Sequence, residues 1–165
     1  MNKNNNKTHT LRVSYKNIPG KGNGDSTRAK QLWHDRNLKH DIICTQENKA
    51  KTFDDATRWF PLKWKENIHC SLNSDSETAI GGILTAINPN SDITFLEHIE
   101  IEKGRAQLIR VKWKNVMTLT IVNIYLHCGE TQNIVLERNK LIKKMKKHPK
   151  IRKAKTLSLE VIGTV

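Results

Sequence analysis

Two stretches near the amino terminus have the pattern of β-strands. At 11–17, hydrophobic and polar residues alternate with a period of two, as on a half-buried strand. At 41–47, the run Asp-Ile-Ile-Cys-Thr-Gln-Glu is mostly apolar in its first half, as in a short buried strand. Both segments end in a side chain that can bind a ligand, Asn17 in the first and Glu47 in the second.

The segment between these strands has a helical pattern. Asp25 or Ser26 can cap a helix that extends to about Leu38. Its apolar face is predicted to consist of Ala29, Leu32 and Trp33. A strand, a helix and a strand at this spacing form a βαβ unit with parallel strands, so Asn17 and Glu47 should emerge at the same edge of the sheet.

The rest of the chain predicts one short helix, five strands and one long helix. Thr52 with Asp55 resembles a capping box for a helix that ends at Phe60-Pro61. The strands are expected at 68–72, 80–88, 93–102, 105–113 and 117–126. Short links at 103–104 and 114–115 imply antiparallel neighbours.

A long helix is predicted from about Thr131 to His148, where Pro149 would end it. One stripe of this helix is apolar and should pack inward: Ile134, Val135, Leu141, Ile142 and Met145. The lysines between these positions then face outward.

The charge of the chain is strongly positive and concentrated in one segment. The sequence has 29 Lys and Arg against 16 Asp and Glu, a net charge of +13. Ten of the basic residues lie between Arg138 and Lys155, where there is no acidic residue, so the rest of the chain carries 19 − 16 = +3. A polyanion, either nucleic acid or an anionic membrane surface, is therefore the first partner to consider. The alternative is an ordinary solvated helix face followed by a basic tail.

Several classes of protein are excluded by what the sequence lacks. No apolar run approaches the ~20 residues that span a bilayer, so we expect no membrane protein. Residues 1–10 are polar and read as a disordered tail, without the apolar stretch of a secretory signal. The three cysteines are widely spaced, which argues against a disulfide framework or a zinc knuckle. We expect an intracellular protein, with the nucleus as one location.

Several motifs occur together in one order along the chain. They are Asn17-Ile18-x-Gly20, Asp41-Ile42-Ile43-Cys44-x-Gln46-Glu47, Gly81-Gly82-Ile83-Leu84, Gly104-Arg105 and Val122-Asn123-Ile124-Tyr125. In order and spacing, over roughly 11–145, they resemble the endonuclease/exonuclease/phosphatase superfamily. The resemblance is greatest to the apurinic-type endonuclease domain of non-LTR retrotransposons.

The resemblance implies an α/β fold, a four-layer sandwich of two mixed sheets with helices outside, and Mg²⁺-dependent hydrolysis of a phosphodiester. Mn²⁺ is the alternative cation. By resemblance, Glu47 is the metal-binding carboxylate, Asn17 orients the metal or the phosphate, and Tyr125 contacts the scissile phosphate. Arg105 and the lysines of the long helix would bind the nucleic-acid backbone: Lys143, Lys144, Lys146 and Lys147.

The sequence also departs from the superfamily pattern. Relatives continue after the basic helix with Gly-Asp-x-Asn and later with Ser-Asp-His, whereas the corresponding stretch here, 155–165, contains neither. His127 stands where relatives tend to carry proline. We therefore expect an incomplete domain at 11–148 and a divergent basic tail at 149–165. This partial sandwich would consist of the first mixed sheet and its flanking helices, with the carboxyl-terminal half missing. Its uncovered apolar sheet face would favour self-association.

Three functional hypotheses remain. The first is a divergent and truncated phosphodiesterase of retrotransposon origin, endonuclease-like and dependent on Mg²⁺. It would act on or bind nucleic acid, with DNA preferred to RNA. Its catalysis would be incomplete, because losing a general base commonly costs ~10²- to 10⁴-fold in rate. The second is a basic module that binds nucleic acid without cleaving it. The third is an unrelated small α/β protein in which these motifs coincide by chance.

Overall fold

The computed structural model describes residues 10–18, 24–73, 81–127, 129–153 and 158–163, and for 24–27 and 158–163 it describes the backbone alone. The strands are β1 (Val13–Asn17), β2 (Ile42–Gln46), β3 (Ile68–Ser71), β4 (Ile83–Ile87), β5 (Ile93–Glu102), β6 (Ala106–Trp113), β7 (Met117–Tyr125) and β8 (Ser158–Gly163). The helices are α1 (Gly24–Asn37), α2 (Phe53–Thr57), the 3₁₀-helix η1 (Leu62–Asn67), α3 (Gln132–Lys147) and α4 (Pro149–Arg152). Residues 1–9 of the expected tail lie outside the described residues.

The strands form two sheets of four. The first sheet has the order β1-β2-β4-β3 and the second has the order β5-β6-β7-β8. β1 and β2 are parallel, with Asn17 opposite Gln46, so the predicted βαβ unit is confirmed. β5, β6 and β7 are antiparallel neighbours, as their short links predicted. β8 runs parallel to β7 and places Gly163 opposite Tyr125.

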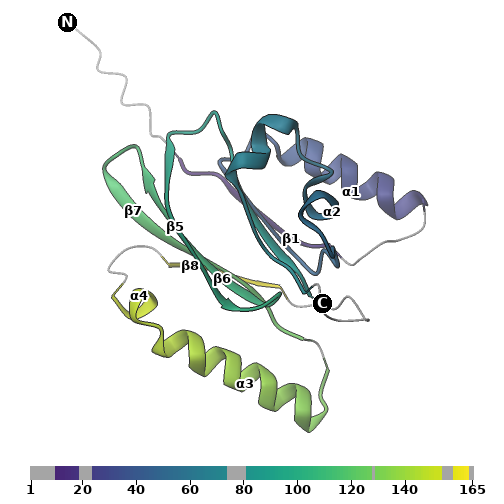
Figure 1. The fold of residues 1–165 in the computed structure, drawn as a ribbon, viewed down its shortest axis with the longest axis vertical. Coiled ribbons are helices and arrows are strands. Elements are labelled where there is room, and N and C mark those ends of the chain that lie inside the picture. The colour runs from purple at the N-terminus through teal and green to yellow at the C-terminus, as the bar shows by residue number, and fades with distance from the viewer. Residues whose placement is uncertain (1–9, 19–23, 74–80, 128, 154–157, 164–165) are drawn as a thin grey trace, which may run out of the picture.

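The two sheets pack face to face, and helices cover their outer surfaces (Figure 1). The core between the sheets contains Ile42 and Cys44 from the first sheet and Ile109 and Ile121 from the second, all nearly inaccessible to solvent. The mixed α/β class and the layered sandwich are therefore confirmed. The expectation that the chain supplies the first sheet alone needs correction, because the strands after Ile87 form the second sheet.

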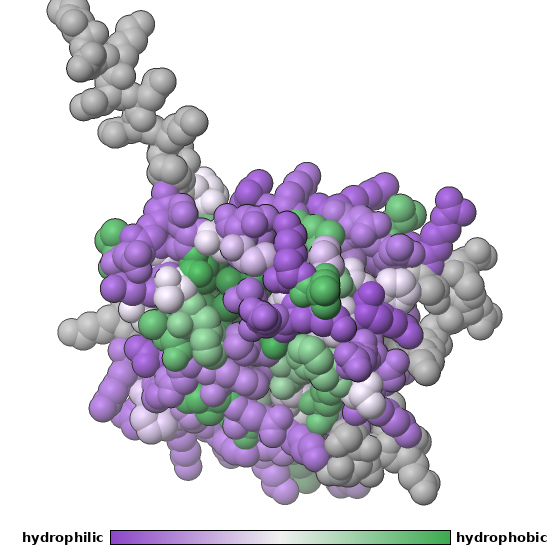
Figure 2. All heavy atoms as spheres, turned by 45° about the horizontal axis from the view of Figure 1, so that its top comes forward, coloured by the Kyte–Doolittle hydropathy of each residue, from purple (hydrophilic) through white to green (hydrophobic). Residues whose placement is uncertain are grey.

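Two further hydrophobic clusters attach the helices to the sheets. Trp64 and Phe60 pack with Ile43 and Leu84 on the outer face of the first sheet, near α1 and α2. Leu141 and Met145 of α3 pack on the outer face of the second sheet, so the predicted apolar stripe is directed inward. The inner faces of the two sheets cover each other, so the uncovered sheet face expected from the sequence is not present among the described residues. Self-association stays a prediction. Figure 2 shows a mainly hydrophilic face on which hydrophobic residues form separate small patches.

The elements differ from the sequence prediction on α1, between Arg58 and Asn67, and after His148: α2 ends at Thr57, and η1 was not predicted. The Thr52 hydroxyl accepts a hydrogen bond from the Asp55 amide at 3.2 Å, which confirms the cap of α2. On α1, by contrast, Ala29 and Leu32 are exposed, and the buried side chains are those of Lys30 and His34. The stretch 149–165, expected as a tail, contains α4 and β8 in its described part. No helix in the described ranges is long and apolar enough to span a membrane.

Candidate functional site

At one edge of the sandwich, the loop after β2, the segment before β4 and the turn between β5 and β6 meet. The amides of Asn48 and Lys49, directly after β2, donate to the carbonyls of Gly82 and Gly81 at 3.1 Å each. The Gly82 amide donates in turn to the carbonyl of Gly104 at 2.8 Å. The two sheets are thus joined at this edge by backbone hydrogen bonds as well as by their apolar core.

This junction requires glycine at both 81 and 82. Their φ angles are +89° and +85°, a region that L side chains rarely adopt. A Cβ at Gly81 would lie 2.7 Å from the Gly104 carbonyl oxygen, and one at Gly82 would lie 2.3 Å from Asn48 Oδ1. The pair of glycines therefore serves the close packing of these loops.

Glu47 occupies a strained position beside this junction. Its φ is +55°, in the left-handed region that costs a residue with a side chain about 1–2 kcal/mol. Its side chain is only 14% exposed, and Lys49 Nζ lies 3.9 Å from Oε1. Such strain persists where the surrounding contacts hold the backbone, and it is concentrated at functional sites.

Asn17 ends the neighbouring strand and carries an unsatisfied amide. Both its Oδ1 and its Nδ2 are buried, and neither has a hydrogen-bond partner. Because β1 and β2 are paired in parallel, Asn17 lies next to Gln46, and Glu47 follows one residue later. A buried amide without partners costs about 1–3 kcal/mol, so this one calls for a ligand that is absent from the protein chain itself.

Asn17 and Glu47 fit a hard divalent cation. Mg²⁺ takes oxygen ligands and commonly uses one or two carboxylates, with water and phosphate completing its coordination. The free Asn17 Oδ1 and the Glu47 carboxylate supply such a donor set at adjacent strand ends. Among the described residues there is no group of three or more His, Cys, Asp and Glu side chains that could hold a metal.

Tyr125 lies on the second sheet at the same edge. Its side chain is 3% exposed, and its amide donates to the Arg105 carbonyl at 2.7 Å. The Tyr125 ring is 5.3 Å from the His127 ring in an edge-to-face arrangement, and its Cδ1 lies 3.8 Å from the Cβ position of Gly81. The glycine junction therefore connects the Glu47 loop with Tyr125.

The pKa of His127 is affected by the charged residues around this edge. Burial and the positive charge of Arg105 lower the pKa of His127, while the carboxylates of Glu137 and Glu47 oppose that shift. Glu47 and Arg105 are thus both close enough to act on one imidazole. The sequence marked His127 only as a departure from the superfamily pattern.

Arg105 presents unsatisfied donors. Nη1 donates to Glu137 Oε2 of α3 at 3.1 Å, but Nε and Nη2 are buried and have no partner. A guanidinium with two free N–H groups in a mostly buried position is suited to an anionic oxygen, because charge-assisted hydrogen bonds of this kind are strong. Arg105 is also one wall of a groove between the β5–β6 turn and α3, with Lys140 and Lys144 on the other side.

Neither a protein-family model nor a curated protein sequence matches this chain. Solved protein structures, by contrast, are similar to this chain. The human Nocturnin catalytic domain with bound sulfate anion covers 92% of the chain with a TM-score of 0.58 and 13% identity. The AP endonuclease LMAP from Leishmania major also covers 92%, with a TM-score of 0.61 and 12% identity. The chain therefore shares the fold of these two structures, an α/β sandwich of two sheets with helices outside.

The chain spans 62% of the Nocturnin structure and 54% of the endonuclease structure. Both neighbours are members of the endonuclease/exonuclease/phosphatase superfamily, so the fold that the sequence resemblance implied is confirmed. The particular relation to retrotransposon endonucleases stays a prediction.

The predicted lysines lie along α3, and of these Lys144 lines the groove beside Arg105. Lys143, Lys144, Lys146 and Lys147 are all exposed, and Lys144 Nζ donates to Glu102 at 2.6 Å. At a rise of ~1.5 Å per residue, Lys147 lies ~15 Å along the helix from Glu137, the residue that contacts Arg105. The structure therefore brings Asn17, Glu47, Tyr125 and Arg105 to one edge and leaves the end of the lysine run outside it. The functional roles assigned to all these residues stay predictions.

Proposed function

We propose that the strand-end site binds Mg²⁺ and a phosphate group of nucleic acid, and that the chain is a divergent endonuclease-like phosphodiesterase domain. The observation that carries this proposal is the buried, unpartnered amide of Asn17 beside the carboxylate of Glu47. Asn17 Oδ1 and Glu47 would hold the cation, with Mn²⁺ as a substitute. A bound cation offsets charge that develops on the phosphate during hydrolysis.

The protein's own residues supply the remaining contacts in this proposal. Arg105 would donate its free Nε–H and Nη2–H groups to a phosphate oxygen, and Tyr125 would orient the phosphate from the second sheet. The glycine junction keeps the loops of both sheets in register, so these donors are held in place before substrate binds. The names of the neighbours, an AP endonuclease and a domain with bound sulfate, support a phosphate-ester substrate.

DNA is the proposed nucleic acid, because the sequence resembles retrotransposon endonucleases of the apurinic type. We further propose that cleavage by this chain is slow. The sequence contains neither Gly-Asp-x-Asn nor Ser-Asp-His, and these segments would position and deprotonate the attacking water. Loss of a general base reduces rates by ~10²- to 10⁴-fold.

The experiment compares nicking of abasic-site DNA and supercoiled plasmid by the wild type and Glu47→Gln, with Mg²⁺ or with chelator. We expect weak nicking that requires Mg²⁺ and is lost in Glu47→Gln. Glu66→Gln, which removes an exposed carboxylate on η1, is the matched control and should nick like the wild type. Nicking that persists in chelator or in Glu47→Gln would contradict the proposal.

The second candidate function is DNA binding without cleavage. It is favoured by the exposed lysines of α3, since Lys143, Lys146 and Lys147 face solvent. Under this alternative, DNA is retained in a strongly salt-dependent manner, Mg²⁺ has no effect on the stability of the protein, and neither DNA substrate is nicked. A rise in melting temperature with Mg²⁺ that is absent from Glu47→Gln separates the first function from the second.

A further inference from the structure

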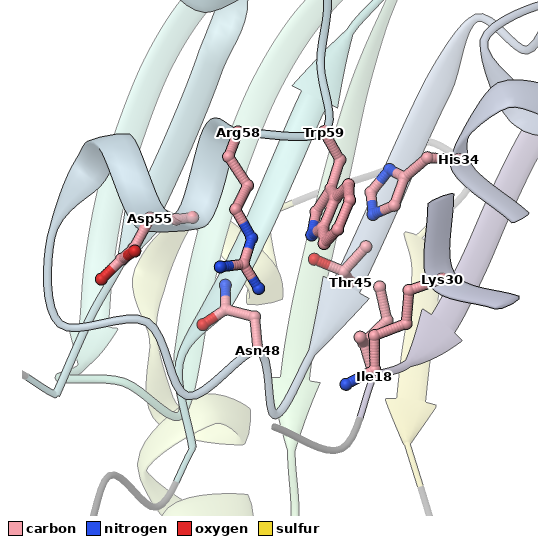
Figure 3. A pocket seen from close by; sticks show the side chains of 9 residues that line it. Ile18, Lys30, His34, Thr45, Asn48, Asp55, Arg58 and Trp59 are labelled. Atoms are coloured by element: carbon pink, nitrogen blue, oxygen red, sulfur yellow. The ribbon is translucent and has the colours of Figure 1, made fainter. Parts of the chain in front are cut away.

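A second polar pocket lies on the helix side of the first sheet, behind the strand-end site. Its walls come from three elements: α1, the carboxyl end of β2 with the loop after it, and the end of α2 (Figure 3). The lining residues that matter here are Lys30, His34, Asn48, Asp55 and Arg58. We call it the α1–α2 pocket.

Two buried polar nitrogens in this pocket have no hydrogen-bond partner among the described residues. His34 is 2% exposed, and its Nδ1 is buried and unpaired. Asn48 Oδ1 accepts from the Ala50 amide at 3.1 Å, but Asn48 Nδ2 is buried without a partner. Unsatisfied groups of this kind are uncommon inside proteins and indicate a missing ligand or water.

The charge of the pocket identifies the kind of ligand. Lys30 and Arg58 line it, against one carboxylate, that of Asp55. The charges of Arg58, Lys49 and Lys16, together with burial, which is the largest cause, lower the pKa of Lys30. Several cations are thus gathered around one small space, and an anion would relieve their repulsion.

Arg58 is held in position for such an anion. Its guanidinium lies 4.7 Å from the centre of the Trp59 ring, a cation–π arrangement. In Figure 3 the guanidinium points toward the Asn48 side chain, while His34 and Lys30 approach from the α1 side. Burial and the charge of Lys16 lower the pKa of His34 to about 4, so at neutral pH its imidazole is neutral and carries one N–H.

The size of the pocket limits the ligand further. The enclosed part of the pocket, about 20 Å³, is little more than one water molecule needs, so only the end of a ligand can enter it, and a base or a sugar must stay outside. A phosphodiester carries a sugar on both sides and needs a groove with two open ends. A phosphate monoester can enter end-on and carries a charge of about −1.5 to −2 at neutral pH.

We propose that the α1–α2 pocket binds a terminal phosphate monoester group, with Lys30 and Arg58 as its cationic contacts and Asn48 as an amide donor. The source is either free phosphate or the phosphorylated end of a nucleic-acid strand. The pocket adjoins Asn17 and Glu47 in sequence, through Ile18 and Asn48, but uses none of the proposed metal-binding atoms. The proposed phosphate binding in this pocket therefore goes beyond the proposed function and does not depend on a bound metal ion.

The test is calorimetric titration of the full chain, in the presence of chelator, with inorganic phosphate and with tetranucleotides that carry a phosphate or a hydroxyl at the 5′ or the 3′ end. We expect a phosphorylated tetranucleotide to bind about tenfold more tightly than its hydroxyl counterpart, which corresponds to one charge-assisted contact. Inorganic phosphate that competes at equal affinity identifies free phosphate as the ligand, and a tighter oligonucleotide identifies a strand end. Both outcomes support the pocket.

Four variants make the test specific. Lys30→Met and Arg58→Gln should each weaken phosphate binding about tenfold, and Asp55→Asn should strengthen it, because it removes the opposing carboxylate. Arg36→Gln, an exposed position on the same helix as Lys30, is the matched control and should bind like the wild type. Since Arg58 is exposed, Arg58→Gln tests the pocket even if Lys30→Met fails to fold.

Equal affinity for phosphorylated and unphosphorylated tetranucleotides, or equal weakening by Arg36→Gln and Arg58→Gln, would overturn the proposal. A failure of Mg²⁺-dependent nicking would leave it standing, because the titration contains no free divalent metal. Conversely, loss of phosphate binding here says nothing against the strand-end site.

Discussion

Gln46 Nε2 donates a hydrogen bond to Asn123 Oδ1 at 3.0 Å, across the space between the two sheets. Asn123 Nδ2 donates in turn to the Leu84 carbonyl at 2.9 Å, so one amide from the second sheet binds two strands of the first. Gln107 makes a similar bridge, from the second sheet to Thr85 Oγ1 at 2.9 Å and to the His69 carbonyl at 3.1 Å. These bonds fix how the sheets align just below the strand ends.

We predict that Asn123→Ala lowers the free energy of unfolding by about 3 kcal/mol, because it removes the buried hydrogen bonds that join Asn123 to Gln46 and to Leu84. Urea denaturation measures this change. The double variant with Gln46→Ala should cost less than the sum of the two single changes. Strict additivity would show that the hydrogen bond between the sheets contributes nothing, and Asn139→Ala on the exposed side of α3 is the control.

The left-handed backbone at Glu47 predicts an unusual order of stability among variants at this position. Glu47→Gly accepts a φ of +55° freely, whereas Glu47→Ala retains the strain, so the glycine variant should be more stable by about 1 kcal/mol. Thermal unfolding compares the two proteins. Both should lose the stabilisation by Mg²⁺ that we expect of the wild type. An alanine variant as stable as the glycine variant would mean that the backbone relaxes after the carboxylate is removed.

The glycine junction should tolerate no side chain. Gly82→Ala places a methyl group 2.3 Å from Asn48 Oδ1 on a backbone with a φ of +85°. We expect a loss of at least ~2 kcal/mol in unfolding free energy, from strain and overpacking together. Gly129→Ala is a useful comparison. Its φ is +126°, but its added Cβ would meet only the far end of Ile134, at 2.8 Å. A smaller loss at 129 than at 82 is therefore expected.

Acid should destabilise the fold through His34. Burial lowers the pKa of His34 to about 4 in the folded protein, from an ordinary value of 6.5. The unfolded chain then binds more protons between these values, so stability falls as the pH drops from about 6.5 to about 4. For one histidine this amounts to about 3 kcal/mol at most.

Denaturation midpoints measured across that range should fall less steeply in His34→Gln than in the wild type. The pKa of His69 is also lowered to about 4 by burial, so part of the slope should remain in the variant. Parallel curves for the two proteins would show that protonation of His34 has no linkage to folding.

Arg105 and Glu137 should have opposite effects on DNA binding. Arg105→Gln removes the unsatisfied N–H groups and should reduce the slope of log affinity against log salt by about 1. Glu137→Gln removes the carboxylate that pairs with Arg105 at 3.1 Å and should strengthen binding. Fluorescence anisotropy at several salt concentrations measures both. A Glu137→Gln protein that binds DNA more weakly would show that Glu137 is needed to position the guanidinium.

The sequence predicts the positions of strands and helices because period and capping are local properties. The parallel pairing of β1 with β2, and thus the meeting of Asn17 and Glu47, follows from the intervening helix. The grouping of the strands into two sheets, by contrast, cannot be predicted from the sequence pattern. β4 is buried throughout and its partners β2 and β3 lie on both sides of it, whereas β5 to β7 read equally well as an extension of the same sheet.

Only those site residues that belong to a recognisable motif can be predicted from the sequence. Asn17, Glu47 and Tyr125 were found by resemblance, and the structure brings their elements together. The inward direction of His34 was not foreseen, because Leu32, which is 47% exposed, looked like the better core residue on α1. The pairing of Arg105 with Glu137 joins residues 32 positions apart, and no local pattern indicates such a contact.

The parallel pairing of β8 with β7 bears on the order in which the molecule folds. β5, β6 and β7 are joined by tight turns, and their contacts can form early and quickly. β8 reaches β7 only after a crossover through α3 and α4, so its closure requires a long loop to be fixed first. We expect the three-stranded meander of a nascent chain to form before β8 has left the ribosome, and the sheet to be completed only once β8 is free to pair with β7.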